Sequence, residues 1–344
     1  MSRTTCHESE MIPSQLPLVC GYVVTYNGKR FLERCFQTLQ QLTDYENFRL
    51  ILVDNGSADG SGDYVRENFP DVEILRIYPN VGYAGAANEA VKDARRRRAK
   101  YIVFSNDDIV ILHSQWLREA VLNTERDPSI GMIGFVDTAS EEGPHPTPEL
   151  TLTDVPFPAS VVYMTPVDLF DRIGMFDTVF FSNGEEDDLG ARTQAAGYRL
   201  VQLDIPIFHF GSATNLKYKT RTVYIFMRNG IRFCLKNRGL MGALLRAVRI
   251  LDVACNPWPV SFDADNGAHR GMRNSGNLPF NFLIWLRAVA WNIIHWPETY
   301  RIRAADRRLI HAARDARKEA GEGRREAYAL PADNSPLETA DVGV

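Results

Sequence analysis

Tyr101-Ile102-Val103-Phe104-Ser105-Asn106-Asp107-Asp108 is the stretch that decides the fold of this chain. Four apolar or aromatic residues predict a buried strand, and the strand ends in a polar cluster with two carboxylates. Open α/β sheets bind ligands at the carboxyl ends of their strands, and paired carboxylates at such a place suit Mg²⁺ or Mn²⁺. The same residues can also form a turn that only ends the strand. On this stretch alone both interpretations stay open.

Strands and helices alternate on both sides of this stretch. The expected strands lie at residues 18–26, 50–53, 72–77, 101–104, 130–136, 159–164 and 199–203, and the expected helices at 31–39, 62–68, 84–98, 115–125, from about 185, and 223–236. This alternation predicts an α/β fold, in which a mixed, mostly parallel sheet is covered by helices on both faces. Residues 137–156, rich in Glu, Pro and Thr, are expected to form a long surface loop.

The composition argues against several classes of protein. The 344 residues carry a net charge of -4, which is unfavourable for general nucleic-acid binding. Five cysteines, an odd number without CxxC spacing, indicate reduced thiols in a cytosolic setting rather than a disulfide framework or a zinc site. Residues 1–15 are polar and carry acids, so they lack the pattern of a signal peptide.

The chain divides into four expected parts. They are a disordered N-terminus at 1–16, an α/β domain at 17–236, a helical extension at 237–310, and a charged helix with a disordered tail at 311–344. The extension holds apolar helical candidates at 240–254 and 280–294, but Arg287 and His295 interrupt the longest apolar run, so no membrane-spanning helix is expected. These helices can pack on the core, on a second subunit in a homodimer, or on the inner face of the plasma membrane.

Three further loops offer polar groups at the same edge of the predicted sheet. In Thr25-Tyr26-Asn27 the tyrosine ring can stack on a base, and in Asp54-Asn55-Gly56-Ser57 the carboxylate can accept a hydrogen bond from a base imide. The small residues of 80–88 let the backbone approach a ligand, and a helix start there offers N–H groups to phosphate. Each loop alone is also an ordinary turn. Together with 106–108 they predict a nucleotide pocket.

These motifs, in this order and spacing, resemble those of the family 2 inverting glycosyltransferases, especially the bacterial rhamnosyltransferase-like members. The resemblance continues in Gly174-Met175-Phe176-Asp177 and in Glu185-Glu186-Asp187-Asp188-Leu189-Gly190-Ala191-Arg192, and it covers residues 18–236. It implies a GT-A fold and a nucleotide-diphosphate sugar donor, such as a dTDP- or UDP-sugar. It also implies a divalent metal, Mg²⁺ or Mn²⁺. The expected acceptor is a polysaccharide or lipid-linked glycan, since the two Trp-bearing helices of the extension suggest a membrane-bound acceptor.

The resemblance implies a role for each matched residue of the donor site. Nucleotide contacts are expected, in chain order, from Thr25, Tyr26, Asn27, Asp54, Asn55, Gly82, Asn88, Asn106 and Asp107. Asp108 matches the last aspartate of the family's metal motif, whereas Asn106 stands at its first position and Asp107 at a variable one.

Three more positions of the matched region have a functional and a structural interpretation. His209, in Ile207-Phe208-His209-Phe210, matches a residue that reaches the metal or the diphosphate, but a histidine among apolar residues can equally be packed in the core. Arg228 matches a position that meets phosphate, and Asp177 one that orients sugar hydroxyls. Both residues can equally form structural ion pairs.

The acidic cluster at 185–188 carries the expected chemistry. The resemblance places Glu186 at the catalytic-base position, with Glu185 and Asp187 as its competitors. An inverting transfer needs a carboxylate to remove the proton of the acceptor hydroxyl. Neighbouring acids raise one another's pKa values, while a helix N-terminus and Arg192 oppose that effect. The plain alternative is an acidic first turn of a helix.

Two other classes of protein compete with a glycosyltransferase. A nucleotidyltransferase needs a Gly-rich, basic loop after the first strand to handle a triphosphate, and Thr25-Tyr26-Asn27-Gly28-Lys29-Arg30 is a poor version of it. A catalytically inactive nucleotide-sugar-binding scaffold is the other class, and the intact carboxylates at 108 and 185–188 argue against it.

Overall fold

The computed structural model describes residues 4–5, 16–138, 140–142, 150–157, 161–211, 220–255 and 278–319. These residues form one ten-stranded sheet with the order β1-β8-β10-β7-β9-β5-β2-β3-β4, and β6 pairs with β10. The strands are β1 Thr4–Thr5, β2 Val19–Thr25, β3 Phe48–Asp54, β4 Glu73–Arg76, β5 Tyr101–Asn106, β6 Ile109–Ile111, β7 Ile130–Thr138, β8 Thr151–Asp154, β9 Val162–Pro166 and β10 Arg199–His209. Strands β2 to β5 run parallel, and antiparallel pairs join them to the rest, as expected for the mixed α/β fold.

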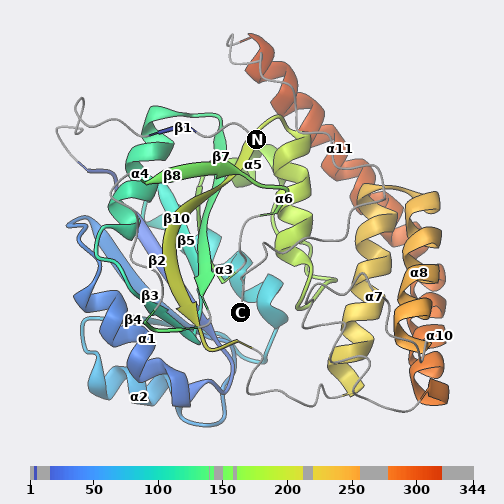
Figure 1. The fold of residues 1–344 in the computed structure, drawn as a ribbon, viewed down its shortest axis with the longest axis horizontal. Helices are drawn as coiled ribbons and strands as arrows, with labels where there is room; N and C mark the ends of the chain where they lie inside the picture. Colours follow the sequence, from blue (N-terminus) through green and yellow to red (C-terminus); the bar gives the residue numbers. More distant parts are fainter. Residues whose placement is uncertain are drawn as a thin grey trace.

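Helices cover both faces of this sheet (Figure 1). They are α1 Lys29–Gln41, α2 Ser61–Asn68, α3 Gly82–Arg96, α4 Trp116–Arg126, α5 Leu169–Ile173, α6 Glu185–Ala195, α7 Thr220–Asn237, α8 Leu240–Cys255, α10 Leu278–Ile294 and α11 Trp296–Glu319. Because side chains alternate along a strand, β5 sends Val103 to one face and Ile102 and Phe104 to the other. Both faces are covered, so residues 101–104 of the strand are all apolar or aromatic.

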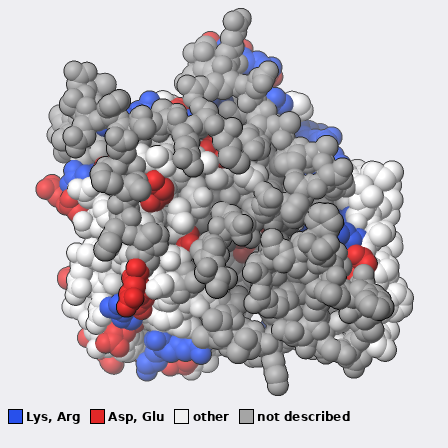
Figure 2. Space-filling model, viewed as in Figure 1, with Lys and Arg blue, Asp and Glu red and all other residues white. Residues whose placement is uncertain are grey.

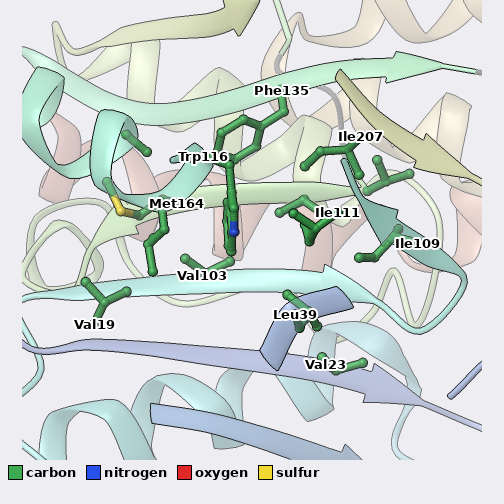
Figure 3. Close-up of a cluster of buried hydrophobic side chains, with 14 of the residues drawn as sticks. Val19, Val23, Leu39, Val103, Ile109, Ile111, Trp116, Phe135, Met164 and Ile207 are labelled. Atoms are coloured by element: carbon green, nitrogen blue, oxygen red, sulfur yellow. The ribbon is translucent and has the colours of Figure 1, made fainter. Parts of the chain in front are cut away.

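The two faces have different cores. On one, the sheet packs against α1, α2 and α4, and the fully buried Trp116 contacts Phe135 with ring centroids 5.4 Å apart (Figure 3). On the other, the alanine-rich side of α3 lies close to the sheet beside α5, α6 and the end of α11. A third apolar cluster joins α7, α8 and α10 at one side of the sheet.

A buried ion cluster fastens these outer helices to the sheet domain. The Asp188 carboxylate of α6 accepts hydrogen bonds from Arg192 Nε at 2.9 Å, Lys236 Nζ at 2.8 Å and Asn237 Nδ2 at 3.0 Å. Lys236 of α7 also lies 2.9 Å from Asp306 of α11. Burial alone would raise the pKa of Asp188, but the charges of Lys236 and Arg192 outweigh burial and lower this pKa well below its ordinary value.

The structure corrects several expected elements. Residues 137–156 are not all loop, since β7 runs to Thr138 and β8 pairs with β10. Strand β10 continues to His209 instead of ending at 203, and β6 follows Asp108 directly. The charged helix begins at Trp296, where Pro297 suits a helix start, and not near 311. Within 1–16, Thr4–Thr5 pair with β8, while the expected tail after 330 lies outside the described residues.

The helices beyond the sheet leave an apolar surface exposed. Its residues, called the apolar face below, are Leu240, Met241, Leu244, Leu245 and Val248 of α8 and Phe280, Phe282, Leu283, Leu286, Ile293 and Ile294 of α10. In the part of the chain that the structure describes, no helix combines the length and apolarity needed to cross a membrane.

Lys236→Met tests the ion cluster. The substitution removes the cation that Asp177, Asp188 and Asp306 share and leaves Arg192 as the partner of Asp188 and Asp306. Breaking a buried pair in this way costs about 3–5 kcal/mol. We expect the free energy of unfolding, measured with urea at pH 7, to fall by that amount. Lys318→Met, at a side chain that is 68% exposed, is the control and should change it by at most about 0.5 kcal/mol. Equal effects of the two variants would contradict a structural role for the cluster.

Candidate active site

The carboxyl ends of β2, β3 and β5 meet at one edge of the sheet, as expected. Thr25 pairs in register with Asp54, and Val24 pairs with Asn106. The polar residues that follow these strands are therefore neighbours in space, and they form one wall of a single site.

Asp107 holds the first loop of this wall in place. Its Oδ2 accepts a hydrogen bond of 2.5 Å from Thr25 Oγ1, and the backbone of Gly28 lies so close that an added Cβ would meet Oδ2 at 1.9 Å. Burial raises the pKa of Asp107 to about 6, with a further contribution from the charge of Asp108, although the bond from Thr25 opposes the rise. Thr25, expected to contact the nucleoside, is 1% exposed and uses its hydroxyl inside the protein.

Asp108 and His209 form the pair that fits a divalent metal. His209 Nε2 lies 3.3 Å from Asp108 Oδ1, because β6 pairs antiparallel with the end of β10. Burial alone would lower the pKa of His209, but its hydrogen bond to Asp108 and the charges of Asp108, Asp137 and Asp107 outweigh burial and raise this pKa. One carboxylate oxygen and one imidazole nitrogen are donors that suit Mn²⁺.

Asp137 lies near this pair, although it was expected at the start of a loop. It is in β7 opposite Ile207 of β10, and burial raises its pKa to about 6, a rise that the charge of His209 opposes. Among the described residues its Oδ1 is buried without a hydrogen-bond partner. No group of three or more His, Cys, Asp or Glu side chains that could hold a metal occurs in the described ranges, so a metal here needs oxygens from a bound ligand as well.

The nucleoside wall keeps one exposed aromatic ring. Tyr26 is 55% exposed and free to stack on a base. Asn27 adopts a left-handed backbone conformation (φ 57°), and its Oδ1 accepts the N–H of Ala58, which ties the first loop to the second. Asp54 Oδ1 accepts the N–H of Ser57, and Asp54 is 6% exposed.

Three expected ligand contacts are occupied by the protein itself. Asn55 Nδ2 donates to the Gly82 carbonyl at 3.1 Å, and its Oδ1 accepts the N–H of Val81. Asn88 uses both ends of its amide on the backbone of Phe176. Gly82 has φ 76°, and a Cβ there would meet the Phe181 carbonyl at 2.4 Å. The side-chain amides of Asn55 and Asn88 are therefore bonded within the protein, and Gly82 allows the close approach of the Phe181 carbonyl.

The four acids of the first turn of α6 fall into two groups. Asp188 is fully buried in the ion cluster, whereas Glu185, Glu186 and Asp187 have no cation within ion-pair distance among the described residues. Burial raises the pKa values of Glu185 and Glu186, and each is also affected by its acidic neighbours. Burial raises the pKa of Asp187 to about 6, against the charge of Arg246. Glu185 is 2% exposed, but Glu186 remains half-buried and accessible.

The loop before α6 is strained and is held by α7. Phe181, Asn183 and Gly184 all have positive φ, at 66°, 66° and 99°, and such a conformation costs on the order of 1 kcal/mol for each non-glycine residue. Asn229 Nδ2 lies within hydrogen-bonding distance of the carbonyls of Phe180, Ser182 and Asn183, at 2.7 to 2.9 Å. These contacts fix the backbone that leads into Glu185 and Glu186.

The expected phosphate contact at Arg228 and the expected sugar contact at Asp177 are used structurally. Arg228 Nη2 donates to the carbonyls of Val179 and Phe180, at 3.0 and 2.8 Å. Asp177 Oδ2 accepts from Arg232 Nη2 at 2.8 Å. Asp177 therefore forms the structural ion pair that the sequence left open, whereas Arg228 bonds to backbone carbonyls and pairs with no carboxylate among the described residues.

The same loop joins the acidic turn to the nucleotide wall. The Phe181 carbonyl accepts a hydrogen bond of 3.3 Å from the N–H of Ala84 at the start of α3. Gly82, next to it, is tied to β3 through Asn55. The edge of the sheet thus places Asp108 beside His209 and exposes the ring of Tyr26, and this loop joins the edge to the acidic turn that holds Glu186.

The chain is similar to known glycosyltransferases in sequence and in fold. Residues 22–181 match the family model described as Glycosyl transferase family 2. A validoxylamine A glucosyltransferase of Streptomyces hygroscopicus is 27% identical over 282 residues, which cover 68% of this chain and 64% of the relative. An N-acetylglucosaminyl-diphospho-decaprenol L-rhamnosyltransferase of Mycobacterium tuberculosis is 34% identical over 76 residues, 22% of this chain and 24% of the relative.

The matches to curated relatives span between 13% and 64% of the length of those proteins. Among solved structures, the mannosyltransferase PcManGT from Pyrobaculum calidifontis, in complex with GDP-Man and Mn²⁺, is 18% identical with a TM-score of 0.52. That likeness covers 81% of this chain and 87% of the other. It confirms the expected GT-A fold.

Glu186→Gln tests the electrostatics of the acidic turn. Because the folded-state pKa of Glu186 lies above its unfolded value, the ionised side chain destabilises the fold, and this cost grows as the pH rises through that folded pKa. We expect the variant to gain about 1 kcal/mol or more in free energy of unfolding at pH 8, and nothing at pH 4, where both forms are largely neutral. Asp188→Asn is the control of opposite sign and should destabilise at pH 8, because the Asp188 pKa is lowered. A loss of stability in Glu186→Gln at pH 8 would contradict a raised pKa of Glu186 in the folded protein.

Proposed function

The chain belongs to glycosyl transferase family 2 through residues 22–181, and on that premise we propose that it transfers a sugar from a nucleotide-diphosphate sugar to an acceptor hydroxyl. The transfer inverts the anomeric carbon and is assisted by a divalent metal. The observation that carries the proposal is the half-buried Glu186, with a raised pKa, in the first turn of α6. The loop before this turn is joined to the edge of the sheet where Asp108 and His209 lie.

In the proposed reaction the acceptor oxygen attacks the anomeric carbon while its proton passes to the Glu186 carboxylate. The bond from the anomeric carbon to the diphosphate oxygen breaks, and the diphosphate keeps the electron pair. Asp108 and His209 would hold a metal ion, which when bound supplies positive charge for the departing diphosphate. A base with a raised pKa suits this task, because it gains driving force for taking a proton near neutral pH.

The protein's own contacts prepare the site for this step. Tyr26 offers its exposed ring to the base of the nucleotide, and Asp54 offers a carboxylate to the base edge. Asp107, Thr25 and Gly28 fix the loop that carries Tyr26. We propose a polysaccharide or lipid-linked glycan as the acceptor. The relative whose name includes a diphospho-decaprenol substrate supports the lipid-linked form.

Donor binding and turnover test the proposal separately. By calorimetry, UDP or dTDP should bind only with Mn²⁺ present, and Asp108→Asn and His209→Ala should each weaken that binding at least about tenfold, through loss of one metal ligand. Glu186→Gln should keep the binding and lower kcat by about 10²–10⁴ in a screen of nucleotide sugars, because the general base is lost. Binding that ignores Mn²⁺, together with no turnover of any nucleotide sugar, would favour an inactive scaffold.

Asn229→Ala tests the clamp on the loop of the base. It removes the three contacts to the loop carbonyls, so we expect kcat to fall about 10²-fold while KM for the donor stays unchanged, as displacement of a reacting group by 1 Å can do. Asn68→Ala, at an exposed end of α2, is the control and should leave both constants unchanged. A folded Asn229→Ala variant with the wild-type kcat would refute the positioning role.

A further inference from the structure

A cavity of about 690 Å³ lies between α7, α10 and the loop that precedes α6. Its walls combine three arginines, Arg221, Arg228 and Arg287, with three aromatic rings, Phe181, Tyr224 and Trp291. None of these residues belongs to the nucleotide wall at β2, β3 and β5, so the cavity is distinct from that wall.

The arginines of the cavity are arranged as stacked cations. Arg287 lies over the Tyr224 ring at 4.6 Å, Arg228 over Trp291 at 4.7 Å and Arg221 over Phe181 at 5.3 Å. Among the described residues no carboxylate forms an ion pair with any of the three. Guanidinium groups held in this way present a planar fork of donors that matches the oxygens of a phosphate. The cavity is therefore suited to an anionic group.

The loop that leads into the helix turn of the proposed base forms one wall of this cavity. Thr178, Val179 and Phe181 line it, and the chain then runs directly into Gly184 and the acidic turn of α6. Arg228 donates to the carbonyls of Val179 and Phe180, so the cavity and the loop share a side chain. A molecule seated in the cavity contacts the segment that positions Glu186.

The apolar face is continuous with the other wall of the cavity. On α10, Leu283, Arg287 and Ile294 are spaced by four and seven residues, which places them on one side of the helix. Leu283 is 62% and Ile294 72% exposed. Figure 2 shows uncharged residues over α8 and α10 at the edge of the molecule. An apolar chain leaving the cavity past Arg287 would therefore lie on exposed apolar side chains.

We propose that this cavity is the acceptor site and binds the phosphate head group of a lipid-linked acceptor, whose hydrocarbon chain lies on the apolar face. The inference rests on the proposed function and specifies its acceptor. Arg221 and Arg287 bind the phosphate oxygens, while Arg228 holds the loop that forms the cavity wall. The rings of Tyr224 and Trp291 flank the adjoining sugar, and the exposed side chains of α8 and α10 cover the hydrocarbon. The positive charge of the arginines thus matches the phosphate end of the lipid-linked acceptor, and the apolar face matches its hydrocarbon end.

Direct binding of octyl phosphate tests the site independently of transfer. Calorimetry is done on the full chain, below the critical micelle concentration and with EDTA, so that no metal draws phosphate to Asp108 and His209. We expect octyl phosphate to bind at least tenfold tighter than octyl glucoside, which has the same tail without charge, and tenfold tighter than inorganic phosphate, which has no tail. The double variant Arg221→Ala, Arg287→Ala should weaken binding at least tenfold, and Arg314→Ala, at an exposed position of α11, should not.

Four outcomes would overturn the inference. Equal binding of octyl glucoside would show that the arginines do not select an anion, and equal binding of inorganic phosphate would show that the apolar face takes no part. A dimer in sedimentation experiments that dissociates on Leu283→Gln would assign the face to a second copy of this chain. Absence of octyl phosphate binding, in a protein that keeps Mn²⁺-dependent binding of UDP or dTDP, would remove the acceptor site and leave the proposed function intact.

Discussion

One buried carboxylate, Asp188, holds together the parts of this protein that must act together. It lies on α6, yet its partners Lys236 and Asn237 come from α7, and Lys236 reaches on to Asp306 of α11. The first turn of α6 therefore has a fixed position relative to the outer helices. The buried negative charge of Asp188 is stabilised by the cations Arg192 and Lys236, and Asp188 in turn stabilises the buried charges of those two residues.

The same helix turn shows how position alone separates acids of equal chemistry. Asp188 points into the ion cluster and has a lowered pKa, while Glu185, Glu186 and Asp187, immediately before it, have raised pKa values because burial is not compensated. One acid thus stabilises the fold and the others destabilise it. The strained backbone of the preceding loop adds to that cost, and the contacts from Asn229 and Arg228 offset it.

The sequence predicted the α/β architecture well because its signals are local: apolar runs ended by polar turns, and helices between them. It also brought Asp54, Asn106 and Asp108 to one edge, since the carboxyl ends of parallel strands must meet there. It could not tell which polar atoms the protein uses itself, so Thr25, Asn55 and Asn88 were expected at a ligand although their groups bond to Asp107, Gly82 and Phe176. Asp137 was missed because its strand leads into a Glu- and Pro-rich segment, yet it ends β7 much as Asp108 follows β5.

Helix α7 contributes residues both to the ion cluster and loop near the proposed base and to the outer cavity. This limits which substitutions the helix can accept. Asn229, Arg232 and Lys236 share its inner side and hold the loop and the ion cluster, whereas Arg221, Tyr224 and Arg228 line the outer cavity. A substitution on α7 can therefore displace the proposed base Glu186 as well as change the cavity. Helix α10 contributes Ile284, Arg287 and Trp291 to the cavity and has none of the ion cluster. Evolution or engineering of acceptor preference should accumulate on α10, while α7 stays almost invariant among relatives that share this chemistry.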